Sequence, residues 1–285
     1  MIYMSFRRRS PFPGGDYSRF FTKRTDWAVP TILLLCVCSF VNSARATERL
    51  LTGADRLFED PYISWIDGKR VGLVTNQTGV NRQLKSLRDL FLDCPRVSLT
   101  ALFAPEHGFR GSAQAGEQVP TSTRIFSLYG EHRRPTADML SNVDVLIYDI
   151  QDVGVRFYTF VSTMLECMKA AASSRKPFIV LDRPNPIDGT RTEGPVLESG
   201  WESFVGIAQI PIRYGMTPAE LARLLKSETQ LDLDLRVVPV SGWKRQQWFN
   251  ETGLQWIAPS PNMPTLTTAA VYPGFCLIEG TNLSE

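Results

Sequence analysis

The chain has 285 residues, 43% of them hydrophobic and 21% charged, so it is long enough for one large domain and part of a second, and too apolar for a disordered chain. Its formal net charge of +2 gives no electrostatic reason to expect binding to nucleic acid. The cysteines beyond residue 46 are Cys94, Cys167 and Cys276, at spacings that match neither a metal motif nor a disulfide framework. We expect Cys167, within a helical apolar stripe, to be a buried thiol.

The first 46 residues have the pattern of an export signal. Basic residues at 7–24 come before an apolar run at 28–41, and Ala44-Arg45-Ala46 then forms an A-x-A cleavage pattern. The run is short for a membrane span, although an uncleaved N-terminal anchor is the alternative. The pattern predicts an exported protein, periplasmic or extracellular after cleavage, with no membrane span in the mature form.

The next elements alternate between strands and helices. Apolar runs typical of strands buried on both faces lie at 71–76, 97–104, 143–150, 178–182 and 235–240. Helical spacing lies between them at 84–92 and 159–174, and a capped helix start lies at 217–220. The alternation predicts an α/β fold with a doubly wound, mostly parallel sheet.

The character of the chain changes after residue 235. Several tryptophans follow, together with a proline-rich loop at 259–264. We interpret this as the start of a smaller C-terminal α/β domain. The predicted organisation is a signal peptide at 1–46, a catalytic domain at 47–235 and the beginning of a C-terminal domain at 236–285.

Four polar loops follow the predicted strands. They lie at 76–79, 105–111, 151–158 and 183–195, and all contain glycine. In an open parallel sheet, ligands bind beyond the carboxyl ends of the strands. Convergence of these loops on one edge predicts a site with carboxylates, amides and arginines.

Glu106 is the first catalytic candidate, because it closely follows a buried strand and precedes one of the two histidines, His107. A carboxyl group at such a position is partly desolvated, and desolvation raises a carboxyl pKa toward general-acid use. The alternative is a loop ion pair between Glu106 and Arg110. His107 is a catalytic candidate as well, or a loop histidine that orients a neighbour.

A second catalytic carboxylate is sought among Asp149, Asp152 and Glu193. We rank Asp152 first, because Gly154 permits close approach of a ligand, and Glu193 second, on an expected exposed turn that closes over the substrate. Asp149 ends a strand, and we expect backbone donors to hold it in a structural role. A role in shaping the turn alone is the alternative for both aspartates.

The substrate-binding candidates are polar or aromatic side chains on the same loops and on two later ones. Arg156 is suited to bind a substrate carboxylate through two hydrogen bonds, or else to pair with Asp152. The asparagines are suited to sugar hydroxyls or an acetamido group, or else to turn formation. The set is Asn76, Arg110, Gln151, Arg156, Tyr158, Asn185, Arg213 and Asn262.

Several activities lack their sequence motifs. There is no phosphate-binding G-x-x-x-x-G-K-[ST], no strand-linked G-x-G-x-x-G and no G-x-S-x-G nucleophile elbow. Two histidines without H-E-x-x-H argue against a zinc hydrolase. We therefore expect neither a metal nor another cofactor.

Seven stretches in order carry a family resemblance. They are 72–79 (GLVTNQTG), 103–111 (FAPEHGFRG), 149–159 (DIQDVGVRFYT), 181–186 (LDRPNP), 211–217 (PIRYGMT), 259–264 (PSPNMP) and 279–282 (EGTN). With these motifs the sequence resembles the peptidoglycan exo-β-N-acetylmuramidases, glycoside hydrolase family 171, long catalogued as a domain of unknown function. The resemblance runs from about residue 53 to the end.

The resemblance implies a Rossmann-like domain with a cleft against a smaller C-terminal domain. It implies release of β-1,4-linked N-acetylmuramic acid from the non-reducing end of peptidoglycan-derived muroglycan or disaccharide. It carries the family's catalytic glutamate of Pro-Glu-His-Gly onto Glu106, as acid or acid/base. Family members are generally longer, so we expect a C-terminally truncated member.

Two other classes of function compete with this one. The first is another exported sugar hydrolase or an esterase on the same fold, and the second is a non-catalytic glycan-binding protein, since fold alone does not choose among them. A second carboxylate near Glu106 favours catalysis, because a binding module does not need it.

Overall fold

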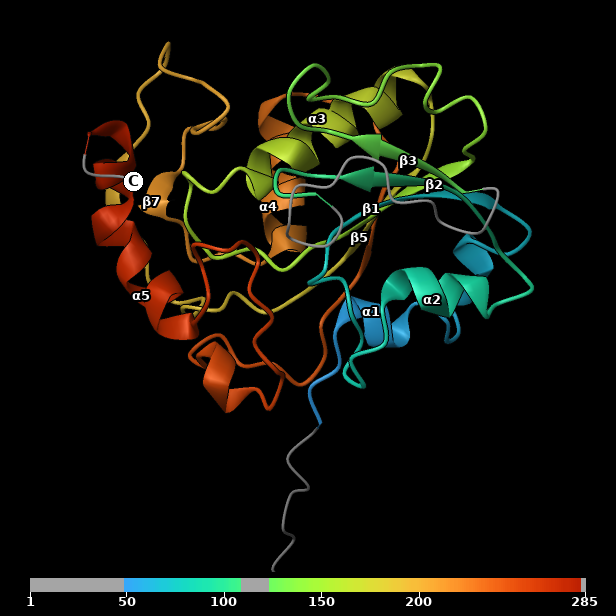
Figure 1. The fold of residues 1–285 in the computed structure, drawn as a ribbon, viewed down its shortest axis with the longest axis horizontal. Helices are drawn as coiled ribbons and strands as arrows, with labels where there is room; N and C mark the ends of the chain where they lie inside the picture. The colour runs from blue at the N-terminus through green and yellow to red at the C-terminus, as the bar shows by residue number, and fades with distance from the viewer. Residues whose placement is uncertain (1–48, 109–122, 283–285) are drawn as a thin grey trace, which may run out of the picture. The chain divides into compact units, whose positions relative to one another are not determined.

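The computed structural model describes residues 49–108 and 123–282, and most of its strands form one parallel sheet (Figure 1). Its strand order is β3-β2-β1-β4-β5-β8, and each neighbouring pair is parallel. The strands are β1 (Arg70–Thr75), β2 (Ser98–Ala104), β3 (Arg124–Ser127), β4 (Val145–Asp149), β5 (Phe178–Leu181) and β8 (Leu235–Val238). The order reverses between β1 and β4, as in Rossmann folds, which confirms the predicted fold class.

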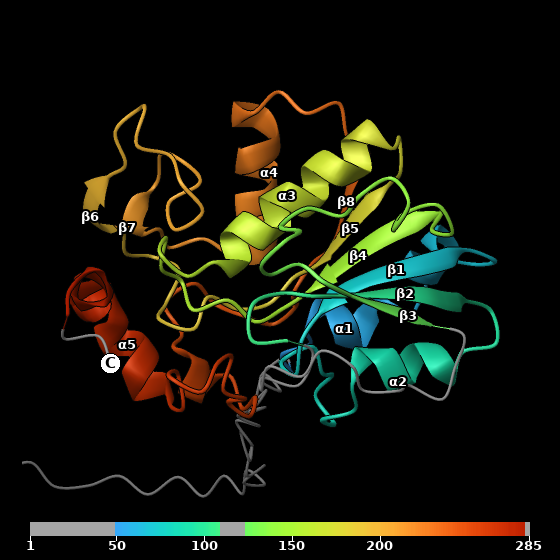
Figure 2. The same ribbon diagram turned by 45° about the horizontal axis from the view of Figure 1, so that its top comes forward.

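Helices cover both faces of this sheet (Figure 2). Helices α3 (Phe160–Ser173) and α4 (Pro218–Glu228) pack on one face, against Tyr148 and Phe178. Helices α1 (Gly53–Arg56) and α2 (Leu87–Leu92) pack on the other face, against Leu73 and Ile147. Because successive side chains of a strand point to opposite faces, Ile147 and Tyr148 serve different cores.

Helix starts follow their capping residues. The predicted start of α4 is confirmed, with Thr217 as N-cap and Glu220 completing the capping box. The expected helix at 84–92 begins only at Leu87. Leu84 has a φ of 62° in the preceding turn, and Ser86 caps the helix through Asp89 N–H.

Three short strands were not predicted from the sequence, and two of them are largely exposed. Strand β3 lies at the sheet edge, and β6 (Glu193–Val196) and β7 (Pro211–Arg213) form a separate antiparallel pair. The expected turn at Glu193 is therefore wrong, whereas the exposure expected for this residue is confirmed. All four residues of β6 are exposed, so the hydrophobic alternation that marks a strand is absent.

The C-terminal segment comprises α5 (Leu266–Phe275) and two short 3-10 helices, η2 (Phe249–Glu251) and η3 (Cys276–Gly280). A further 3-10 helix, η1 (Tyr62–Trp65), precedes β1. The sheet ends with β8 at Val238, and the domain boundary at 235 stays a prediction. Cys167 is buried in α3, as expected.

The predicted signal peptide at 1–46 lies outside the described residues. Within 49–108 and 123–282, no helix has the length and apolar character needed to cross a bilayer.

Candidate active site

The loops after β1, β2, β4 and β5 are joined to one another by hydrogen bonds. The backbone N–H of Gln151, after β4, donates to Thr78 Oγ1, after β1, at 2.9 Å. Its side-chain Nε2 donates to Pro184 O, after β5, at 3.0 Å. Thr159 Oγ1 donates to Glu106 Oε2, after β2, at 2.8 Å. The predicted convergence of four loops on one sheet edge is thus what the structure shows.

Glu106 lies on a tight turn. Gly108 N–H donates to Pro105 O at 3.0 Å, and His107 has a φ of 69°. A β-turn with positive φ at its third residue usually carries Gly or Asn there, and a non-glycine residue in this region costs about 1–2 kcal/mol. The strain at His107 is stored next to the candidate acid, which is where functional sites tend to hold such conformations. Glu106 itself is only partly buried, so solvent reaches the residue.

Asp152 is placed inside the protein. Its Oδ2 accepts hydrogen bonds from Gly154 N–H at 2.9 Å and from the hydroxyl of Tyr214. Among the described residues no donor reaches its buried Oδ1. Burial raises the pKa of the Asp152 carboxyl to about 7. The Asp152 carboxyl thus joins its own loop to the end of β7. This geometry favours a role in shaping the turn over a role as the second catalytic carboxylate.

Asp149 has the structural place that was expected for it, although an arginine holds it. The Arg183 guanidinium donates Nε to Oδ1 at 2.6 Å and Nη2 to Oδ2 at 2.9 Å, and both side chains are buried. Gly79 allows this arrangement, because a Cβ there would lie 2.0 Å from Thr75 Oγ1 and 3.2 Å from Asp149 Oδ2. The pair fixes the ends of β4 and β5 together.

Glu193 is an exposed carboxylate at the start of β6. It accepts a hydrogen bond from Arg213 Nη1 at 2.8 Å. Arg213 also donates Nη2 to Asp188 Oδ2 at 2.9 Å and lies over the ring of Trp248 at 5.6 Å. Arg213 is therefore already neutralised by two carboxylates.

Arg156 is buried and does not pair with Asp152. Its Nη1 donates to the backbone carbonyls of Pro195 and Ile210, in the segment that forms and joins β6 and β7. The guanidinium lies 5.1 Å from the centre of the Phe157 ring. Arg156 thus fastens the β6–β7 pair to the loop after β4. The third predicted arginine, Arg110, lies outside the described residues.

The amide candidates divide between turns and the surface. Asn76 Oδ1 accepts from Thr78 N–H at 2.9 Å, and Asn185 Oδ1 accepts from Ile187 N–H at 3.1 Å, so both form the local turns given as their alternative. Asn262 is exposed on the proline-rich loop. Gln77 Nε2, in the loop after β1, donates to Ala258 O and Pro259 O at the start of this proline-rich loop.

Tyr158 belongs to an aromatic cluster. Its ring meets Phe160 edge-on at 4.8 Å and Tyr272 of α5 at 5.9 Å between ring centres. It is buried, so its ring packs the loop after β4 against α5.

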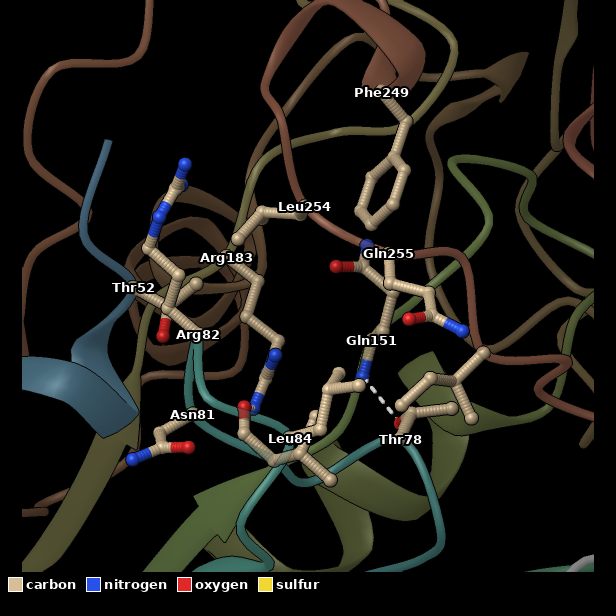
Figure 3. A pocket seen from close by; sticks show the side chains of 12 residues that line it. Thr52, Thr78, Asn81, Arg82, Leu84, Gln151, Arg183, Phe249, Leu254 and Gln255 are labelled. Atoms are coloured by element: carbon tan, nitrogen blue, oxygen red, sulfur yellow. Dashed lines mark hydrogen bonds between the residues drawn. The ribbon is translucent and has the colours of Figure 1, made fainter. Parts of the chain in front are cut away.

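A separate pocket lies at the carboxyl ends of β1, β4 and β5 (Figure 3). It encloses about 370 Å³, counting the space that is open to solvent. Figure 3 shows Phe249 and Leu254 at one end and Thr78 and Leu84 at the other. Glu106 is not among its 12 lining residues. The pocket therefore lies where the strand order reverses, between β1 and β4, and not around the candidate acid.

The contacts of three residues of the site were not predicted from the sequence: Thr159, Arg183 and Tyr214. Thr159 directly precedes a helix, where a hydroxyl residue is ordinarily explained as a cap, and this masked its contact with Glu106. Within the described parts of the chain, no group of three or more His, Cys, Asp or Glu side chains is arranged to hold a metal ion.

Comparison with known proteins places the chain in a family. A sequence profile described as the N-terminal part of exo-beta-N-acetylmuramidase NamZ matches residues 71–267. Peptidoglycan beta-N-acetylmuramidase NamZ of Bacillus subtilis (strain 168) is 50% identical over 250 residues, which are 86% of this chain and 60% of that protein.

Two solved structures of DUF1343 family proteins from Bacteroides fragilis NCTC 9343 are also similar. One has a TM-score of 0.76 at 46% identity, covering 81% of this chain and 60% of its own. The other has a TM-score of 0.70 at 36% identity, covering 81% and 62%. The chain thus spans about 60% of the length of these relatives. Because the profile extends over well more than half of the sequence, the chain belongs to the NamZ exo-β-N-acetylmuramidase family.

Proposed function

We propose that the protein hydrolyses β-1,4-linked N-acetylmuramic acid from the non-reducing end of peptidoglycan fragments. The relative from B. subtilis is named a peptidoglycan β-N-acetylmuramidase, and family membership supports the same activity here. The observation that carries the proposal is Glu106, a partly exposed carboxyl on a tight turn that is hydrogen-bonded by Thr159.

Hydrolysis of a glycosidic bond requires a carboxyl group of this kind. A glycosidic oxygen is a poor leaving group until it is protonated, so a positioned carboxylic acid must donate a proton as the bond breaks. Glu106 supplies this proton as acid, or as acid and then base. Its neighbour His107 has the left-handed backbone conformation of this tight turn.

The second group of the reaction is one of three candidates. Asp152 is buried and engaged by Tyr214 and Gly154, which supports a role in shaping the loop. Glu193 is exposed, and its carboxylate is shared only with Arg213 among the described residues. The third candidate is the acetamido group of the substrate, oriented by a nearby Asn or Asp. Solvent access favours Glu193 over Asp152.

The lactyl carboxylate distinguishes muramic acid from glucosamine, and an arginine is suited to bind it through two hydrogen bonds. Arg213 is neutralised by Asp188 and Glu193, and Arg156 is occupied by backbone carbonyls. We therefore assign this role to Arg110. We also propose that the N-terminal signal directs the protein out of the cytoplasm, to the compartment that contains peptidoglycan.

The test is release of free N-acetylmuramic acid by the full-length protein from a chromogenic β-N-acetylmuramide, with the matching β-N-acetylglucosaminide as control. Cleavage of the muramide alone supports the proposal. Equal cleavage of both sugars indicates a less specific hexosaminidase. Binding of muroglycan without cleavage of either sugar indicates a glycan-binding protein, and overturns the proposal.

A further inference from the structure

Thr159 stands apart from the other helix-starting residues of the protein. All five α-helices within the described residues begin after a Ser or Thr. In four of them the hydroxyl oxygen accepts a hydrogen bond from a backbone N–H of the first turn, the usual N-cap arrangement; these residues are Thr52, Ser86, Thr217 and Thr265. The side chain of Thr159 makes no such bond with α3.

The backbone of Thr159 explains the difference. Its φ and ψ are −70° and −6°, in the helical region, whereas the capping threonine of α4 is extended, with ψ at 162°. The carbonyl of Thr159 accepts from Thr163 N–H at 2.9 Å, just as the carbonyl of Thr217 accepts from Leu221 N–H at 2.9 Å, so the two residues differ in backbone angles and side chain and not in this bond. Its hydroxyl is then directed away from the first turn and donates to Glu106 Oε2 at 2.8 Å. The helix forgoes a cap, and the hydroxyl serves the candidate acid.

The loop before Thr159 is held at several points. Arg156 N–H donates to Ile212 O at 2.8 Å, and Tyr158 N–H donates to Val155 O at 3.0 Å. Tyr158 and Phe160 flank Thr159 in the sequence, and their rings pack against each other with centres 4.8 Å apart. A hydroxyl fixed in this way is in place before substrate arrives, which is the condition for effective electrostatic support of a reaction.

We propose that Thr159 is a positioning residue for Glu106, an inference that rests on the proposed function. A carboxylic acid carries its proton on one oxygen and accepts on the other. Donation by Thr159 to Oε2 leaves Oε1 to carry the proton toward the glycosidic oxygen. As that proton leaves, the bond from Thr159 becomes charge-assisted and stronger, so it stabilises the transition state more than the ground state.

The experiment compares three variants of the full-length protein on the chromogenic muramide. Thr159→Val keeps the shape and removes the hydroxyl, and Thr159→Ser keeps the hydroxyl. Thr163→Val is the matched control, because Thr163 is a buried threonine one turn further along α3 whose hydroxyl has no hydrogen-bond partner among the described residues. We expect Thr159→Val to lower kcat by about 10- to 100-fold with KM unchanged, as for loss of a hydrogen bond to a charged group. Thr159→Ser should recover most of that loss, and Thr163→Val should match the wild type.

Two results overturn the positioning role. One is a Thr159→Val enzyme with kcat within about twofold of the wild type, and the other is a Thr159→Ser enzyme as slow as the valine variant. A wild-type protein that cleaves no muramide counts against the proposed function instead. In that case a double-mutant cycle between Thr159→Val and Glu106→Ala, each of which removes the hydrogen bond, still tests the contact by urea unfolding. Additive effects in the cycle would overturn it.

Discussion

Asp149 and Arg183 form a buried two-point ion pair, with Nε–Oδ1 and Nη2–Oδ2 distances of 2.6 and 2.9 Å. The same guanidinium donates to Val80 O at 2.8 Å, so one side chain joins the ends of β4 and β5 to the loop after β1. The loop after β4, which ends at Thr159 beside Glu106, starts from this junction.

Breaking this pair should unfold much of the site. Arg183→Met leaves the Asp149 carboxylate buried and unpaired, which typically costs about 3–5 kcal/mol. The free energy of unfolding in urea measures the loss. Arg236→Met is the control, because the Arg236–Asp234 pair is exposed and such pairs contribute about 0–1 kcal/mol. Similar losses of unfolding free energy in both variants would show that the buried pair contributes no more to stability than the exposed pair.

Glu106→Gln should keep the fold and lose nearly all turnover. The amide accepts the bond from Thr159 as the carboxyl does, and has no proton to give to the leaving oxygen. General acid catalysis typically contributes about 10²- to 10⁴-fold, so kcat on the muramide should fall by this amount while the urea midpoint changes little. Glu131→Gln, at an exposed side chain, is the control. Near wild-type turnover of the Glu106 variant would remove the central assignment.

Asp152 should make stability depend on pH. Its pKa rises from 3.8 to about 7 because the carboxyl is buried, so between these values the folded protein keeps a proton that the unfolded chain releases. The free energy of unfolding should therefore fall as pH rises from about 4 to 7, by up to about 4 kcal/mol, and level off above.

Asp152→Asn should flatten this dependence, since the asparagine oxygen still accepts from Gly154 and Tyr214. Asp182, whose pKa burial raises to about 6, gives a comparison, because Asp182→Asn should flatten only the part below about pH 6. Unfolding in urea at several pH values measures both profiles. An unchanged slope in Asp152→Asn would mean that the carboxylate is ionised in the folded protein throughout.

The arginines should separate substrate selection from stability. Arg110→Ala should erode the preference for muramide over glucosaminide, because it removes the proposed partner of the lactyl carboxylate. Arg156→Ala should instead lower stability by about 1–3 kcal/mol, since it leaves the carbonyls of Pro195 and Ile210 without their donor. The ratio of kcat/KM for the two sugars and the urea midpoint distinguish the two effects. Loss of the preference in Arg156→Ala alone would return the selecting role to Arg156.

The layered core could be predicted from the sequence because its signals are local. Continuous apolar runs mark strands buried on both faces, and Thr217-Pro218-Ala219-Glu220 marks a helix start by its own chemistry. Strands β3 and β6 carry no such signal. Their side chains are mostly exposed, and only pairing with β2 and β7 makes them strands.

The loops of the site could be predicted, and the partners within them could not. Asp152 and Arg156 are four residues apart, which suggested an ion pair, yet each bonds to the β6–β7 region instead. The contact of Thr159 with Glu106 joins residues 53 positions apart. Such contacts depend on how the loops are arranged in space, which the periodicity of the sequence does not predict.

Cys167 is completely buried on α3, and burial raises the pKa of its thiol well above the usual range. A thiol reagent therefore reacts with it only when α3 separates from the sheet. The same separation would carry Thr159 away from Glu106. Alkylation of Cys167 thus reports the opening of the helix that Thr159 precedes, and its rate should rise with temperature in step with the loss of turnover.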